Sequence, residues 1–190
     1  MSSDEMRRES WRRKFATDDV MLKAEPNAGH RALAAFQQRH PGRLTLITQN
    51  VDGLHQRAGS TDAIALHGNL ADDRWLDMPR DCCDPAFVEA GHPPHCPTCG
   101  NLRRPAVVWF GERLPLPALD AAQKAANGCN LMLVVGTSGV VYPAAGLAHT
   151  AHRRGARVVV INPEATELDV VADLCLHEPA AQCLPTLLED

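Results

Sequence analysis

This chain of 190 residues lacks three features, and each absence argues against a class of protein. Basic charge is not in excess, because 19 Lys and Arg stand against 23 Asp and Glu, for a net charge of −4. That balance supplies no electrostatic attraction to nucleic acid or to an anionic membrane surface, so we expect neither as a partner. An uninterrupted apolar run is also missing. The longest run, LMLVVGTSGVVYPAAGLA, is broken by Gly, Thr, Ser and Pro and makes a poor membrane span.

The third missing feature is a secretory signal. The first residues, MSSDEMRRESWRRKF, are charged, and no apolar core segment follows them, so we expect a cytoplasmic protein. The seven cysteines are odd in number, and four of them lie close together in the sequence: Cys82, Cys83, Cys96 and Cys99. In a cytoplasmic chain this clustering indicates metal binding rather than disulfides.

Apolar strand-like segments alternate with helical ones along the chain. Strands are expected in RLTLIT, in DAIALHGNL as far as His67, and in AVVWFGERLP, NLMLVVGTS, ARVVVINPE and DLCLHEP. Helices are expected in EPNAGHRALAAFQQRHPG, where Asn27 is the predicted cap, and in PALDAAQKAANG, PAAGLAHTAHRRG and CLPTLLED. No structure is predicted for Met1–Lys14. This order predicts one α/β domain over residues 1–190, with a parallel sheet covered on both faces. Residues 71–106, which are rich in Pro and Cys, are expected to form a small irregular module inserted in it.

Polar groups follow three of the buried strands at the point where each strand ends. In open parallel sheets, ligands bind outside the carboxyl ends of the strands. Amide, hydroxyl and carboxylate groups at three such ends suit a nucleotide-like ligand. The residues are Gln49, Asn50 and Asp52, then Gly136, Thr137 and Ser138, then Asn162 and Glu164. The Gly136 turn alone is weak evidence, since strand-to-helix turns also use Gly and Ser for capping.

His67 and the cysteines leave alternatives open. A lone histidine is more often structural than catalytic, but Gly68 beside His67 would allow a ligand to approach the backbone closely. Cys96 and Cys99 have the Cys-x-x-Cys spacing of half a zinc knuckle, closed by Gly100. The second pair, Cys82 and Cys83, is adjacent, and neighbouring side chains tend to point apart. The alternatives are a four-cysteine site, a site with three cysteines and His92 or His95, and a packed remnant without metal.

Seven strings, in this order along the chain, resemble motifs of one family: PNAGHRAL, TQNVDGLHQRAG, LHGNL, CPTCG, LRRPAVVWFGE, VVGTSGVVYPAAG and INPE. Together they resemble the sirtuin family of NAD-dependent protein lysine deacylases, from about Pro26 to the end of the chain. VVWFGE and VVYPAAG are most similar to its bacterial and mitochondrial deacylase branch. The resemblance implies a Rossmann-like parallel sheet with a small zinc-ribbon-like insert, NAD and Zn²⁺ as cofactors, and acylated lysine side chains of proteins as partners.

The resemblance also implies roles for individual residues. His67 would be the general base, with Asn50 and Asp52 as further catalytic residues. NAD would be bound by Gln49, Asn50, Val51, Asp52, Gly136, Thr137, Ser138, Asn162, Pro163, Glu164 and Ala180. An acyl-lysine peptide would add as a strand along Val108, Phe110, Gly111 and Glu112. The zinc ligands would be Cys82, Cys83, Cys96 and Cys99, and Trp75 falls where the family places its first cysteine.

Two family features have no counterpart in the chain. No Gly-Ala-Gly-x-Ser loop precedes Pro26, so the resemblance implies a Rossmann-like sheet that is truncated at its amino-terminal end. The desuccinylase branch carries a Tyr-x-x-Arg pair upstream of the PNAGH helix. The only tyrosine here is Tyr142, so we expect a deacetylase-like preference rather than one for acidic acyl groups.

Three hypotheses therefore stand after the sequence alone. The chain is an NAD-dependent deacylase that lacks its amino-terminal part, or it is a catalytically impaired remnant that binds acyl-peptides or another partner. The third hypothesis is that translation starts upstream of Met1 and that this chain is a shortened reading of an active enzyme.

Overall fold

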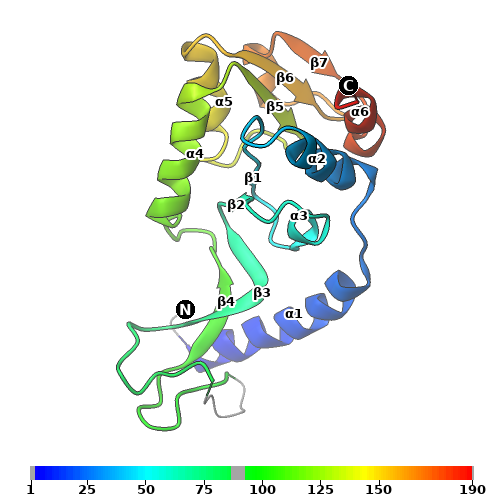
Figure 1. The fold of residues 1–190 in the computed structure, drawn as a ribbon. Coiled ribbons are helices and arrows are strands. Elements are labelled where there is room, and N and C mark those ends of the chain that lie inside the picture. Colours follow the sequence, from blue (N-terminus) through cyan, green and yellow to red (C-terminus); the bar gives the residue numbers. More distant parts are fainter. Residues whose placement is uncertain (1–2, 87–92, 190) are drawn as a thin grey trace. The chain divides into compact units, whose positions relative to one another are not determined.

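The computed structural model describes residues 3–86 and 93–189, and the chain divides into two units (Figure 1). The small unit comprises Met1–Glu25, Asn50–Gly53 and His67–Gly111. The large unit comprises Pro26–Gln49, Leu54–Leu66 and Glu112–Asp190. The chain passes from one unit to the other several times, so neither unit is a continuous piece of sequence.

The small unit contains α1 (Asp4–Lys23), β3 (Gly68–Trp75) and β4 (Arg103–Val107). Helix α1 covers a segment whose first half gave no structural prediction. Its start is set by Ser3, whose hydroxyl accepts the N–H of Met6 at 3.3 Å. Trp11 is only 2% exposed, and its Nε1 donates to the carbonyl of Arg103 at 3.2 Å, which fixes α1 against β4.

Strands β3 and β4 form an antiparallel ribbon with a register shift between Gly68 and Asp73. Strands β3 and β4 extend into the two ends of residues 71–106, so the expectation of irregular structure was wrong for residues 71–75 and 103–106. The polar sequence of β3, GNLADDRW, explains why this strand was not predicted. A strand of a two-stranded ribbon buries little surface and needs no apolar alternation to form.

Parallel strands form two sheets in the large unit. One sheet pairs β1 (Ile47–Thr48) with β2 (Ile64–Ala65), and the other has the order β5 (Leu131–Val135), β6 (Arg157–Ile161), β7 (Leu174–Leu176). Among the described residues no ladder joins β1 to β5, so each is an edge strand of its own sheet. The predicted parallel α/β organisation is confirmed, although the first predicted strand is shorter than RLTLIT.

The helices of the large unit are α2 (Ala28–Arg39), α3 (Leu54–Arg57), α4 (Leu116–Gly128), α5 (Gly146–Arg153) and α6 (Ala180–Leu187), with a 3₁₀ turn η1 (Glu167–Val171). Asn27 caps α2 as predicted. Its side chain accepts the N–H of His30 at 3.1 Å, and the N–H of Asn27 donates to Nδ1 of His30 at 3.3 Å.

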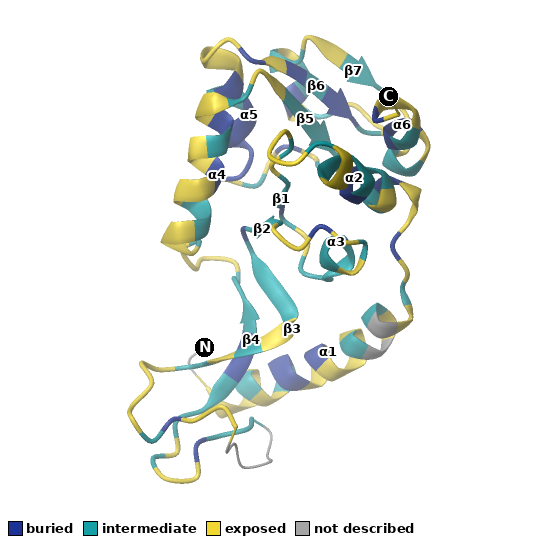
Figure 2. Cartoon of the chain, in the orientation of Figure 1, coloured by how far each residue is buried: buried dark blue, intermediate teal, exposed yellow. Residues whose placement is uncertain are grey.

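Helices cover both faces of these sheets. One apolar cluster packs α2 and α6 against β6 and the segment before β1, with members Leu33, Leu46, Ile161 and Leu184. A second cluster packs α4 and α5 against both sheets, with members Ile47, Ala122, Met132 and Leu147. Figure 2 shows buried residues along β6, where Val158 and Ile161 are 0% exposed. The parallel strands are thus held between two helix layers, as their apolar sequences predict.

No helix in the described part of the chain is both long and apolar enough to span a membrane.

Candidate active site and metal centre

The loop Asn50–Gly53 follows β1 but belongs to the small unit, whereas Gln49 just before it belongs to the large unit. The carbonyl of Val51 accepts the N–H of Leu70 in β3 at 2.9 Å. Asn50 is exposed and Asp52 is half-buried. The predicted pocket residues of this loop are therefore anchored on the ribbon of the small unit.

His67 lies immediately before β3 and is half-buried. Its carbonyl accepts the N–H of Val108 at 2.9 Å, which joins it to the chain leaving β4. Gly68 has φ +79°, and a Cβ there would lie 2.0 Å from the carbonyl oxygen of Ala106. The close neighbour that requires glycine in this structure is thus the protein's own β4.

The predicted peptide-binding edge follows β4. Val108 and Trp109 are half-buried, whereas the side chain of Phe110 is fully exposed. Gly111 has φ +86° and ends the small unit, and the exposed Glu112 begins the next stretch of the large unit. The structure therefore places His67, Val108 and Phe110 in one unit, with a direct backbone hydrogen bond between the first two.

The predicted adenosine-binding residues lie in the large unit, in the loops after β5 and β6. The carbonyl of Ser138 accepts the N–H of Glu167 at 3.4 Å, and Thr137 Oγ1 accepts the N–H of Gly139 at 3.3 Å. In the neighbouring loop, Nδ2 of Asn162 donates to the carbonyl of Glu164 at 2.7 Å. Parallel strands bring these two loops to one edge of the sheet, the edge where open α/β folds bind ligands.

Ala180, the predicted adenine contact, is the first residue of α6. A Cβ on Gly29 of α2 would lie 3.1 Å from the carbonyl oxygen of Ala180. This close packing of α2 against α6 fixes the position of the Ala180 backbone. Hydroxyl, amide and carboxylate groups with fixed backbone positions are a donor and acceptor set that fits a dinucleotide.

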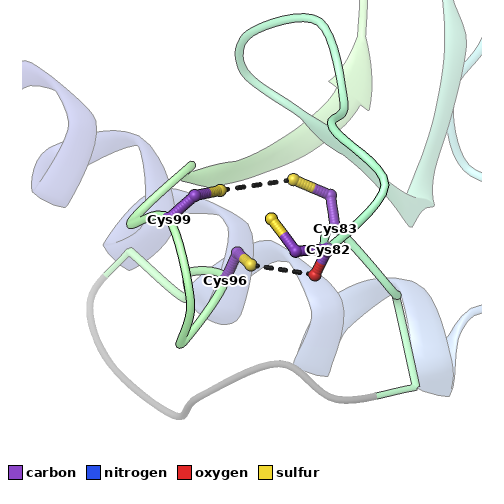
Figure 3. Close-up of side chains that lie close together, drawn as sticks. All are labelled: Cys82, Cys83, Cys96 and Cys99. Carbon is purple, nitrogen blue, oxygen red and sulfur yellow. Dashed lines mark hydrogen bonds between the residues drawn. The ribbon is translucent and has the colours of Figure 1, made fainter.

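Four cysteines of the small unit converge on one point (Figure 3). The Sγ atoms of Cys82, Cys83, Cys96 and Cys99 all lie within 4.8 Å of one another, and Sγ of Cys83 is 3.5 Å from Sγ of Cys99. A tetrahedral zinc with Zn–S bonds of about 2.3 Å separates its sulfurs by about 3.8 Å, so the four thiols fit such an ion. The adjacent pair, Cys82 and Cys83, thus points inward with both side chains.

His92 and His95 were the two histidines considered as alternative zinc ligands. His95 forms an isolated β-bridge with Leu102 and is not a member of the metal-binding group found in the described part of the chain. His92 lies outside the described residues.

Backbone hydrogen bonds from Cys99 and Thr98, partly opposed by burial, lower the pKa of Cys96 to about 7. A hydrogen bond with Cys99 and burial raise the pKa of Cys82 to about 12. Backbone donors aimed at the sulfur of Cys96 are typical of the turn in a zinc knuckle.

Comparison with known families identifies the chain. The model of the Sir2 family matches residues 1–143, which is most of the sequence. The chain belongs to the Sir2 family. The match includes the residues before Pro26, in which the sequence alone had revealed no family motif.

Curated relatives within this family share a name. A protein of Ralstonia nicotianae named NAD-dependent protein deacylase is 56% identical over 86% of this chain and 65% of its own length. Its namesake in Aquifex aeolicus is 44% identical over 90% of this chain and 69% of its own length. The chain thus spans about two thirds of the length of these Sir2-family relatives.

Solved Sir2 structures are similar in fold. A mutant Sir2 homologue in complex with ADP-ribose has a TM-score of 0.84 at 37% identity, covering 95% of this chain and 72% of that one. A complex of Sir2 with a p53 peptide and NAD⁺ has a TM-score of 0.78 at 36% identity, and the match covers 89% of this chain and 71% of that one. These neighbours confirm the predicted Rossmann-like fold, and the cysteine cluster is consistent with the predicted zinc-binding insert.

The sequence missed one residue beside the predicted site. Arg104 of β4 is buried, and it contacts the segment that contains Val108 and Phe110. The signal was the Arg-Arg pair in the string LRRPAVVWFGE, which could not reveal which arginine is buried.

Proposed function

We propose that this Sir2-family chain is an NAD-dependent protein-lysine deacylase. It would move the acyl group of an acylated lysine to ADP-ribose, with release of nicotinamide. The observation that carries the proposal is the hydrogen bond from Val108 N–H to the His67 carbonyl, because it joins the proposed base to the proposed peptide edge. The names of relatives up to 56% identical support the same activity.

The proposal gives each group of residues a task. NAD would supply the ribose that accepts the acyl group, together with nicotinamide as the leaving group. His67 would take a proton from a ribose hydroxyl, a task that suits an imidazole because its ordinary pKa is near neutrality. Asn50 and Asp52 would line the nicotinamide and ribose pocket with Gln49 and Val51. The adenosine half would be held by Gly136, Thr137, Ser138, Asn162, Pro163, Glu164 and Ala180.

The substrate would bind as an added strand along Val108, Phe110, Gly111 and Glu112. Main-chain hydrogen bonds would hold the peptide in register, and the exposed ring of Phe110 would contact its side chains. With Tyr142 as the only tyrosine, no Tyr-x-x-Arg pair is present to bind an acidic acyl group, and this supports a preference for acetyl-lysine over succinyl-lysine.

Zinc would have a structural role in this enzyme. A site with four thiolates is closed and leaves no position for a substrate. Cys82, Cys83, Cys96 and Cys99 would therefore hold together the module at residues 71–106. The need for reduced thiols at this site supports a cytoplasmic location, which fractionation of cells would test.

Release of nicotinamide tests the activity. The purified chain is incubated with NAD and with acetyl-lysine, succinyl-lysine or unmodified lysine peptides, and nicotinamide is measured by chromatography. We expect release with the acetyl peptide, less with the succinyl peptide and none with the unmodified one. His67→Ala is expected to lower the rate at least about 100-fold, because it removes the general base.

A different result would favour the alternative function. Absence of release with every peptide, together with identical behaviour of His67→Ala, would contradict the deacylase. The alternative is a binding module for acyl-peptides that does not turn them over. Binding of a fluorescent acetyl-lysine peptide without turnover would then support that module.

A further inference from the structure

Arg104 of β4 is a buried cation that has no task in the proposed chemistry. It is 5% exposed, and burying a guanidinium is costly unless fixed partners compensate for the lost water. Its Nη2 donates to the carbonyl of Val107 at 3.0 Å. Its Cζ lies 5.1 Å from the ring centroid of Trp109, a distance at which a cation is attracted to the indole face.

These two partners flank Val108. Strand β4 ends at Val107, and the N–H of Val108 donates to the His67 carbonyl. The next residues leave the ribbon, and Phe110 is fully exposed. Arg104 therefore fixes the chain on both sides of the residue that is bonded to His67.

We infer that Arg104 is a positioning residue, which holds Val107–Trp109 in the path that an acyl-lysine peptide needs for strand addition. The inference rests on the proposed function, because it names what the peptide edge of that site depends on. If this edge is already ordered before binding, the free energy of peptide binding does not include the entropic cost of ordering the edge. Loss of Arg104 should therefore weaken peptide binding more than it slows the reaction.

Arg103 provides a matched control on the same strand. It also donates to a backbone carbonyl, that of Asp73, at 3.0 Å, and its Cζ lies 4.9 Å from the ring centroid of Trp75. Adjacent side chains on a strand point to opposite faces, so Arg103 makes the same kinds of contact away from the peptide edge. A weakening of peptide binding in variants of both arginines would indicate general structural damage. A weakening only in variants of Arg104 would indicate the positioning role.

The kinetic test compares Arg104→Met, Arg104→Lys and Arg103→Met with the unmodified chain. For Arg104→Met we expect the KM for an acetyl-lysine peptide to rise about tenfold, while the KM for NAD stays within about twofold and kcat within about threefold. Arg104→Lys should recover part of the loss, since it keeps the charge but not the planar fork. Arg103→Met should change neither KM. Equal peptide KM values in Arg104→Met and Arg103→Met would overturn the inference.

Hydrogen exchange tests the positioning without any turnover. Amide exchange in residues 106–111 is expected to speed up at least about tenfold in Arg104→Met and to stay unchanged in Arg103→Met. Unchanged exchange in Arg104→Met would overturn the inference even if the enzyme is active. Faster exchange confined to Arg104→Met would uphold the positioning role, and an inactive unmodified chain would then count against the proposed function only.

Discussion

Gly68 decides, by having no side chain, how closely β3 and β4 approach beside His67. A Cβ at this position would lie 2.0 Å from the Ala106 carbonyl oxygen, and φ is +79°. Gly42 has nearly the same backbone angle, φ +77°, but a Cβ there would have no neighbour within 4 Å. Substitution of Gly42 therefore tests backbone strain alone, whereas substitution of Gly68 tests backbone strain together with close contact.

We expect Gly42→Ala to lower the free energy of unfolding by about 1 kcal/mol, the cost of placing alanine in the left-handed region. Gly68→Ala should cost about 3 kcal/mol or more, because the new methyl group also pushes Ala106 away. Urea unfolding followed by circular dichroism measures both values. Equal costs for the two variants would show that β4 can move without penalty, and His67 would then not depend on Gly68 for its position.

At the scale of elements, the start of α2 was predictable from the local sequence. Asn27 was expected to start α2, and it does, because a cap depends on two residues three positions apart in sequence. Strand β3 was missed, because a polar ribbon is stabilised by its partner β4, about 30 residues away, and by the packing of α1 against the ribbon. Local patterns reveal local interactions, and β3 depends on distant ones.

The cap of α2 gives a prediction at this scale. Asn27→Ala should lower the free energy of unfolding by about 1 kcal/mol, because the N–H of His30 loses its acceptor. Asn27→Asp should retain most of the stability, since it keeps an oxygen in the same place. Thermal unfolding of the three proteins measures the difference. A loss of the same size in Asn27→Asp would show that the cap is not what stabilises the start of α2.

At the scale of the whole molecule, the same sequence supplies two units with different sources of stability. The large unit has apolar clusters between its helices and sheets. No core cluster of that kind is found among the described residues of the small unit, which has instead α1, a two-stranded ribbon and four convergent cysteines. Small units without a sizeable core commonly rely on a metal or disulfides.

Zinc content is therefore the prediction for the whole chain. We expect about one zinc ion per chain by elemental analysis, and a large loss in Cys96→Ser, because a serine hydroxyl is a poor zinc ligand. Cys129→Ser is the matched control, since Cys129 is a free cysteine of the large unit, outside the cluster. It should keep the full zinc content.

Chelation of the metal extends this prediction. Removing zinc should speed up amide exchange in the small unit more than in the large unit, whose core does not include the cysteines. Equal zinc in the unmodified chain, Cys96→Ser and Cys129→Ser would contradict the four-cysteine site.

The sequence by itself determined the family resemblance, the parallel α/β organisation, the cap of α2 and the cysteine pair Cys96–Cys99. Each depends on residues close together in the chain or on a periodic apolar pattern. Only the tertiary structure decided that the adjacent Cys82 and Cys83 both point to one centre, that the Asn50–Gly53 loop is anchored on β3, and that Arg104 rather than Arg103 is buried against the peptide edge. Those outcomes depend on contacts between residues far apart in sequence, and such contacts exist only once the chain has folded.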